Sequence, residues 1–172
     1  MGAIERALKA AWQELRKPAS YVKGDEFECY IRNSLFPHVN YDLLHKNYDY
    51  LTSKLFYIES SNEPDFKFRA QKSGAEFFIE AKYRSHFYKG RLEWCKTYQL
   101  RRYQVINKET PIFVVIGVGG QPMTPERVFL VPVKDIKYTV LFQSFLRKYE
   151  IPTDQRVSEK DLFSNKESID VN

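Results

Sequence analysis

The chain has little cysteine and no long apolar run, and both shortages narrow the kinds of protein it can be. Its 172 residues include two cysteines, Cys29 and Cys95, which form neither a CxxC pair nor a cluster with histidine. We therefore expect no zinc site and no disulfide framework, and a cytoplasmic location fits best. No run approaches the roughly 18 apolar residues of a membrane span, and the N-terminal segment lacks the apolar core of a signal peptide. We expect no membrane association.

The charge of the chain is unevenly distributed. The net charge is +5, but the segment 151–172 holds five acids and three bases, so residues 1–150 carry +7. A basic body suits a polyanionic partner. An apolar fraction of 43% indicates a packed domain and not a disordered chain. We predict one domain over residues 1–150, with an N-terminal helix 2–17 packed on it and a polar tail from 151 to 172.

The chain contains a succession of helical and strand-like patterns. Helical spacing of apolar residues predicts helices over residues 2–17, 24–36, 91–107 and 134–150. Alternating or continuous apolar runs predict strands over residues 64–71, 76–84, 111–118 and 127–133, with a further strand within 40–60. The run 111–118, "PIFVVIGV", indicates a central strand buried on both faces. This order predicts an α/β fold, a central mixed β-sheet flanked by helices on both faces.

Two charged residues stand inside the apolar strand "EFFIEAKYR" at 76–84. Side chains alternate along a strand, so Glu80 and Lys82 share one face while Phe77 and Ile79 take the other. Asp65 lies on the polar face of the preceding strand, and the residues "KSGA" between the two strands are typical of a turn. The sequence therefore predicts a hairpin.

The register of this hairpin decides what the charged residues can do. With a loop centred on Lys72 and Ser73, Asp65 lies across from Glu80. With a loop centred one residue later, Asp65 faces Lys82. Either even-length loop brings the two acids and the lysine onto one face, whereas an odd-length loop separates them unless a bulge intervenes.

Two carboxylates at such close range repel each other and need a cation between them. An oxygen-only site of this kind suits Mg²⁺ (or Mn²⁺), which keeps several bound waters. A neighbouring lysine can orient or activate a water and balance the charge of a phosphate. Metal, water and ammonium together are the components that phosphodiester hydrolysis needs.

Three motifs resemble those of a known group of enzymes, the PD-(D/E)xK nuclease superfamily. Pro64-Asp65 and Glu80-Ala81-Lys82 resemble its signature. The stretch "QLRRY" at 99–103 is similar to the QxxxY motif of RecB-like and lambda-exonuclease-like members. The stretch "GDEFE" at 24–28 resembles the first helix of Mrr-like and Holliday-junction-resolvase-like members. The matches span residues 24–118, and the resemblance implies a restriction-endonuclease-like core.

The resemblance also implies roles for individual residues. Asp65 and Glu80 would bind the divalent metal with help from the carbonyl of Ala81, and Lys82 would position the attacking water. Glu28 would bind metal through water or serve a second ion.

The resemblance implies that residues of the QxxxY helix and near it orient catalytic groups or contact the nucleic acid. Gln99 would orient Lys82 or the phosphate, with Tyr103 one turn further along the same helix face. Arg84, Arg101, Arg102 and Tyr103 are the candidates for contacts with nucleic acid.

Each motif also has a purely structural interpretation. Glu80 and Lys82 could form a weak ion pair on a solvated face. Asp25-x-x-Glu28 matches a capping box at a helix that begins after Gly24, with Glu28 bonded back to the helix start. The two motif residues of the 91–107 helix could be part of a polar rim.

The leading hypothesis is a metal-dependent nuclease that hydrolyses DNA, with RNA as an alternative substrate and a homodimer as a possible assembly. The second hypothesis is a nucleic-acid-binding module that kept the fold and lost catalysis. A third is an interaction protein with fortuitous motifs.

Overall fold

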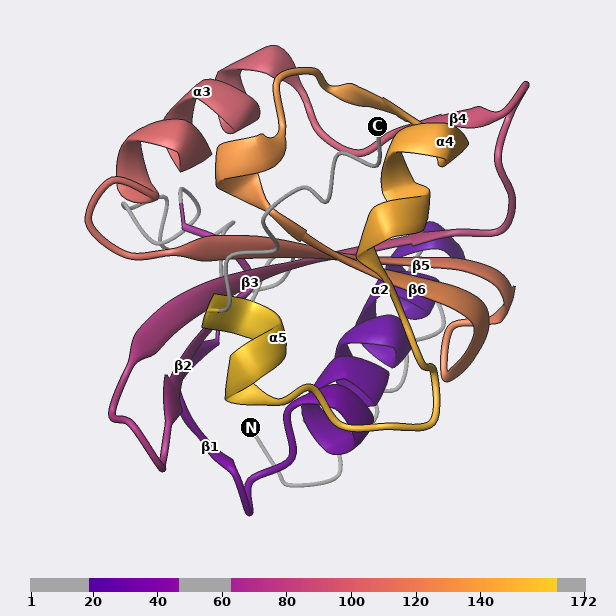
Figure 1. Ribbon diagram of the computed structural model, residues 1–172. Helices are drawn as coiled ribbons and strands as arrows, with labels where there is room; N and C mark the ends of the chain where they lie inside the picture. The colour runs from indigo at the N-terminus through magenta and orange to yellow at the C-terminus, as the bar shows by residue number, and fades with distance from the viewer. Residues whose placement is uncertain (1–18, 47–62, 164–172) are drawn as a thin grey trace, which may run out of the picture.

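A mixed six-stranded β-sheet forms the centre of the protein in the computed structural model, which describes residues 19–46 and 63–163 (Figure 1). The strand order is β1-β2-β3-β5-β6-β8; β3 and β5 run parallel, and the other neighbours are antiparallel. The strands are β1 Tyr41–Lys46, β2 Phe66–Ala70, β3 Glu76–Arg84, β5 Ile112–Gln121, β6 Thr124–Pro132 and β8 Glu150–Ile151. A separate small sheet pairs β4 (Arg91–Glu93) with β7 (Val140–Phe142).

Helices cover both faces of the sheet, as the sequence predicts. The helices are α2 Ala19–Tyr30, α3 Thr97–Ile106, α4 Gln143–Leu146 and α5 Glu159–Phe163. In Figure 1, α3, α4 and the β4/β7 pair lie above the sheet, and α2 and α5 lie below it. Each face has its own apolar core, one built with Phe27 of α2 and Leu162 of α5, the other with Leu100 of α3 and Leu146 of α4. The prediction of an α/β fold with a mixed sheet is confirmed.

The hairpin of β2 and β3 has the first of the two predicted registers. Phe66 pairs with Ile79 and Arg69 with Glu76, and the Ala70 N–H donates to the Ala75 carbonyl at 2.8 Å. The loop therefore holds four residues, 71–74, and is centred on Lys72 and Ser73. Continued by one residue, the same register sets Asp65 opposite Glu80.

The strand β5 is buried from Ile112 to Gly119, as predicted for a strand with a neighbour on each side and a core on each face. Its partner β6 ends at Pro132, where the missing N–H ends the ladder. Gly117 of β5 faces α2 so closely that an added Cβ would lie 2.4 Å from the Phe27 ring. This glycine lets the helix approach the sheet.

The prediction that a helix begins after Gly24 is wrong. The helix α2 begins at Ala19 and includes Gly24, and it continues into a π-helical turn over Ile31–Leu35. A single glycine inside a helix costs only about 1 kcal/mol, which the packing of Phe27 and Tyr30 offsets. Asp25 is consequently an interior residue of the helix and does not cap it.

The two helices predicted for 91–107 and 134–150 are correct only in part. Residues 91–93 form β4, because Leu92 is buried between two exposed neighbours and the segment pairs with β7; α3 begins at Thr97. Residues 133–149 divide into two 3₁₀ turns (Val133–Asp135 and Arg147–Tyr149), the strand β7 and the short helix α4. Pairing between segments distant in sequence overrides the helical spacing here.

The segment after Pro152 packs on the domain as far as Phe163. Val157 and Leu162 are buried in the core beside α2, and the Tyr41 hydroxyl donates to the Val157 carbonyl. The predicted helix 2–17, the second half of the segment 40–60 and residues 164–172 lie outside the described residues. Of the helices described, none combines the length and the apolar character that crossing a lipid bilayer requires.

Candidate active site at the start of strand β2

The site lies beside the start of β2, past which β3 continues without that neighbour. The last paired residue of the ladder is Phe66, opposite Ile79, whereas β3 extends to Arg84. On this side of β3 the Ala81 N–H donates to Asp65 Oδ2 at 2.7 Å. A carboxylate thus takes the hydrogen bond that a neighbouring strand would otherwise accept, and Asp65 is held against the backbone of β3.

Glu80 is the one charged side chain that is fully buried among the described residues, at 2% exposure. Its Oε1 accepts from Lys82 Nζ at 2.5 Å and from Gln99 Nε2 at 3.1 Å. Its Oε2 accepts from the Tyr103 hydroxyl at 2.6 Å, and Gln99 Nε2 also donates to the Tyr103 oxygen at 3.0 Å. Three groups, Lys82 from β3 and Gln99 and Tyr103 from α3, therefore form one network around this carboxylate.

The electrostatics indicate an excess of negative charge. Burial and then the neighbouring Glu80 raise the pKa of Asp65 well above its usual range, although Lys82 and the Ala81 N–H act in the opposite direction. Burial alone would lower the pKa of Lys82, but Glu80 and Asp65 outweigh it and raise that pKa. Burial and Glu80 likewise raise the pKa of Tyr103, which keeps the hydroxyl a donor. The lysine is cationic, and one ammonium is shared between two acids.

Glu28 approaches the site from α2. Its Oε2 lies 3.0 Å from Lys46 Nζ of β1, and its charge contributes to the raised pKa of Asp65. Because α2 begins nine residues earlier, at Ala19, the capping-box interpretation of Glu28 is wrong. Its charge thus acts on Asp65 from α2.

The donor set fits a hard divalent cation. In a strand, the N–H and the C=O of any one residue point to the same side. The Ala81 N–H points toward Asp65, so its carbonyl also faces the gap beyond β2. Two carboxylates and one carbonyl oxygen suit Mg²⁺, which takes few protein ligands and keeps waters. No cluster of three or more His, Cys, Asp or Glu side chains that could hold a metal ion occurs in the described part of the chain, so Glu28 does not join Asp65 and Glu80 in one set of direct ligands.

The four residues predicted to contact nucleic acid lie in different surroundings. The prediction that Tyr103 contacts nucleic acid is wrong, because its side chain is 2% exposed and its hydroxyl donates to Glu80. Arg101 lies two residues from Gln99, roughly 200° around α3, and is exposed on the outer face of the helix, not at the site. Arg102 is half-buried and lies over the Tyr98 ring at 5.9 Å. Arg84 donates to the carbonyl oxygens of Glu93 and Tyr83.

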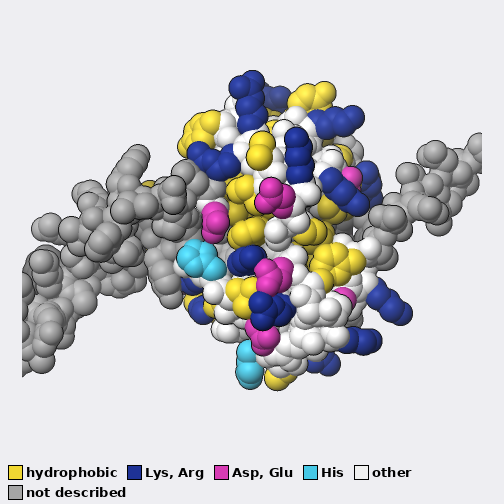
Figure 2. All heavy atoms as spheres, turned by 90° about the vertical axis from the view of Figure 1, so that its left-hand side faces the viewer, with side chains coloured by type: hydrophobic (Ala, Val, Ile, Leu, Met, Phe, Trp, Pro, Cys, Tyr) yellow, Lys and Arg dark blue, Asp and Glu magenta, His cyan; other side chains and the backbone are white. Residues whose placement is uncertain are grey.

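The outer surface of α3 is nonetheless basic. Figure 2 shows Lys and Arg side chains gathered at the upper end of the face seen there, where α3 lies. Arg101 is an exposed residue of α3.

Two open grooves flank the end of β3. The first, the β4 groove, has a volume of about 450 Å³ and is lined by residues that include Arg84, Tyr88, Arg91, Trp94, Lys96 and Gln99. The second, the α2 groove, has a volume of about 460 Å³ and is lined by residues that include Ser20, Lys23, Gly24, Lys82 and Arg84. Arg84 lines both grooves, and the Lys82 side chain is 23% exposed. The ammonium of the site is therefore within reach of solvent.

The sequence patterns did not single out Tyr88, Arg91 or Lys96, because residues 91–107 matched a helix. The available signal was Lys89-Gly90, a dipeptide typical of a tight turn. Cys95 also lines the β4 groove, but burial raises the pKa of its thiol to about 12, so it is no nucleophile at neutral pH.

Sequence comparison assigns no family, because no protein-family model matches the chain and no curated protein matches it significantly. Among solved structures the chain is similar to Hjc, a Holliday junction resolvase of Archaeoglobus fulgidus. The TM-score is 0.42 and the identity 12%, over 62% of this chain and 77% of that chain. A likeness of this size carries no conclusion about substrate or activity.

Proposed function

We propose that the chain is a nuclease of the PD-(D/E)xK type that hydrolyses phosphodiester bonds of DNA with the help of Mg²⁺ or Mn²⁺. The observation that carries the proposal is the convergence of Asp65, Glu80 and Lys82 at the start of β2, with the pKa of Asp65 raised by burial and by Glu80. A fold that needed this strand only for packing would gain nothing from a buried, undercompensated pair of acids. Such perturbed groups are concentrated at functional sites.

In this proposal Asp65, Glu80 and the Ala81 carbonyl would hold the cation, and Glu28 would act through a bound water or on a second ion. The cation, when bound, would polarise the phosphate and lower the pKa of a bound water. Lys82 is cationic and reachable from the α2 groove, so it can hold a water or a phosphate oxygen by hydrogen bonding.

Gln99 and Tyr103 act through Glu80. Both donate to its carboxylate, so they fix the orientation of that group. They are positioning residues, since each donates to the carboxylate that would hold the cation, and Tyr103 is itself buried.

The test is a cleavage assay with Mg²⁺ or Mn²⁺ on linear, single-stranded, nicked and branched DNA and on RNA. We expect Asp65→Asn, Glu80→Gln and Lys82→Ala each to lower the cleavage rate by about 100-fold or more. The matched control is Glu76→Gln on the same strand, whose carboxylate pairs with Lys67 and Arg69 at the far end of β3. This control should keep its rate.

Calorimetry of metal binding separates the alternatives. Absence of cleavage on every substrate together with absence of metal binding would rule out the enzyme. Salt-dependent DNA binding without cleavage would identify a binding module of the same fold.

A further inference from the structure

The β4 groove is bordered by a rigid two-residue hairpin. The Tyr88 N–H donates to the Arg91 carbonyl at 2.9 Å, and the Arg91 N–H donates back to the Tyr88 carbonyl at 3.2 Å. Between them, Lys89 and Gly90 have φ angles of 50° and 71°. Two positive φ angles define a type I′ turn, the tightest connection between antiparallel strands. The turn fixes Tyr88 and Arg91 opposite each other.

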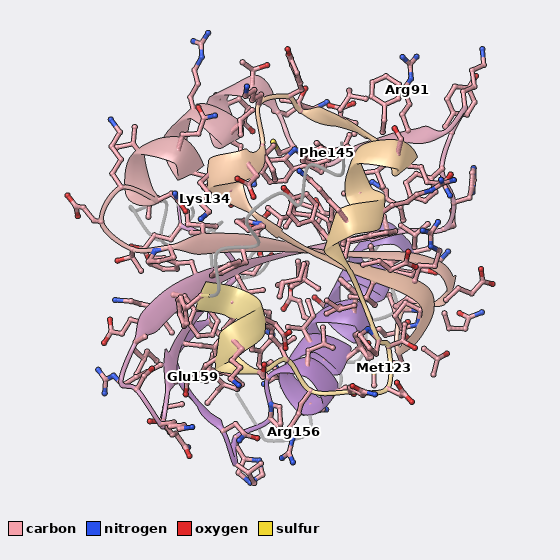
Figure 3. All side chains as sticks on the ribbon, viewed as in Figure 1. Arg91, Met123, Lys134, Phe145, Arg156 and Glu159 are labelled. Carbon is pink, nitrogen blue, oxygen red and sulfur yellow. The ribbon has the colours of Figure 1, made fainter. Side chains whose placement is uncertain are left out.

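This hairpin carries an exposed aromatic ring beyond the body of the protein. The segment between β3 and β4 extends outward at the upper right of Figure 1. Tyr88 is 65% exposed, and the Lys89 ammonium lies 5.5 Å from the centre of its ring. In Figure 3 the Arg91 side chain points outward from the same end of the molecule. An exposed tyrosine in a turn with a strained lysine is not explained by packing.

The chemistry of the groove suits a polyanion. Its lining includes three basic side chains, Arg84, Arg91 and Lys96, against one acid, Glu93. Glu93 is engaged by Lys96 at 2.6 Å, so the net charge of the groove is positive. The lining also has an apolar part, to which the buried Trp94 and Leu92 belong. The groove also includes Gln99, which bonds to the buried Glu80 carboxylate, so a strand lying in it would pass beside the candidate site.

We propose that the β4 groove receives an unpaired polynucleotide strand, with the Tyr88 ring stacked on a base and Arg91 and Lys96 in contact with its phosphates. This proposal rests on the proposed nuclease function, because it gives the substrate of that site a single-stranded portion. The faces of bases are open in a single strand and covered by neighbouring bases in a duplex, so a stacking ring selects the former. Basic side chains beside an aromatic ring are the usual components of such a site.

Binding can be measured apart from cleavage. The full chain, kept in EDTA, is titrated into a fluorescently labelled 20-nucleotide strand of DNA, the same strand of RNA, and the corresponding duplex, with anisotropy as the readout at several salt concentrations. We expect Tyr88→Ala to weaken binding of the single strands by about 5- to 100-fold and Tyr88→Trp to retain it. Arg91→Gln and Lys96→Gln should each reduce the salt dependence by about 0.7 in slope.

The control is Tyr138→Ala, which removes an equally exposed ring, at 72%, that does not line the groove. Thermal melts of all variants should agree with the parent chain, because the altered side chains are exposed. The proposal is overturned if the chain binds no single strand, if Tyr88→Ala binds within twofold of the parent, or if Tyr138→Ala loses as much. Tyr88-dependent binding by a chain that cleaves nothing would support the groove and refute the nuclease.

Discussion

Replacement of Tyr103 by phenylalanine tests the network around Glu80 most directly. The change removes one hydroxyl, which donates to Glu80 Oε2 at 2.6 Å, and leaves the ring in place. Because Glu80 is 2% exposed, water cannot replace the lost donor without a rearrangement of the core. A buried carboxylate oxygen then stays without its partner.

A hydrogen bond to a charged group contributes about 1.5–3 kcal/mol, and the burial at this site argues for the upper part of that range. Tyr103→Phe should therefore lower the free energy of unfolding by about 1.5–3 kcal/mol in urea titrations without metal. For a chain of this length the melting temperature should fall by about 3–12 °C. Tyr98→Phe is the matched control on the same helix, because Tyr98 is 66% exposed, and it should change the free energy by less than about 0.5 kcal/mol.

The same substitution in a Glu80→Leu variant distinguishes the loss of the hydrogen bond to Glu80 from a general loss of packing. In a Glu80→Leu chain the acceptor is absent, so the further change of Tyr103 to phenylalanine should be nearly neutral. The reasoning is refuted if Tyr103→Phe costs less than about 0.5 kcal/mol, or if its cost is the same with and without the Glu80 carboxylate.

Three further predictions concern stability alone. Gly117→Ala should lower the free energy of unfolding by about 1–3 kcal/mol, because its Cβ would lie 2.4 Å from the Phe27 ring; an unchanged melting temperature would contradict the close approach. Gly24→Ala should raise the free energy of unfolding by about 0.5–1 kcal/mol in the same melts, since the site is a helix interior with no atom within 4 Å. The Arg127 guanidinium donates to both carboxylate oxygens of Glu150 at 2.7 Å and lowers the pKa of that carboxylate below 4.5. The ion pair therefore stabilises the fold above pH 4.5, and this stabilisation is lost as the pH falls through the lower pKa of the folded state. Arg127→Met should thus destabilise by less than about 1 kcal/mol at pH 7 and by nothing measurable at pH 3, as followed by urea unfolding; an equal loss at both pH values would exclude the ion pair as its cause.

The hairpin was the most predictable part of the fold. Alternation placed Phe66 and Phe68 on one face, and the turn residues between Ala70 and Ala75 allowed two even registers, of which the structure has one. The register follows from local information, because the hydrophobic face and the turn are both encoded within twenty residues. This register also sets Asp65 opposite β3, the strand that carries Glu80 and Lys82.

The small β4/β7 sheet was not predictable in the same way. Its strands have three residues each and are separated by 46 residues, and Leu92 is the only buried residue of β4. Such pairs are stabilised by contacts that no short window of sequence contains. The same limit applies to the fate of Tyr103, whose burial against Glu80 depends on where α3 packs on the sheet.

The placement of Asp65 at the end of the β2–β3 ladder ties the assembly of the site to the acquisition of the fold. A slip of one residue in this pairing would expose Phe66 and Phe68 and move Asp65 away from the Ala81 N–H in the same event. No stable misregistered form with an incomplete centre is therefore expected to accumulate. In a preparation of this protein, the fraction of molecules that are folded and the fraction that carry a complete centre should be the same number.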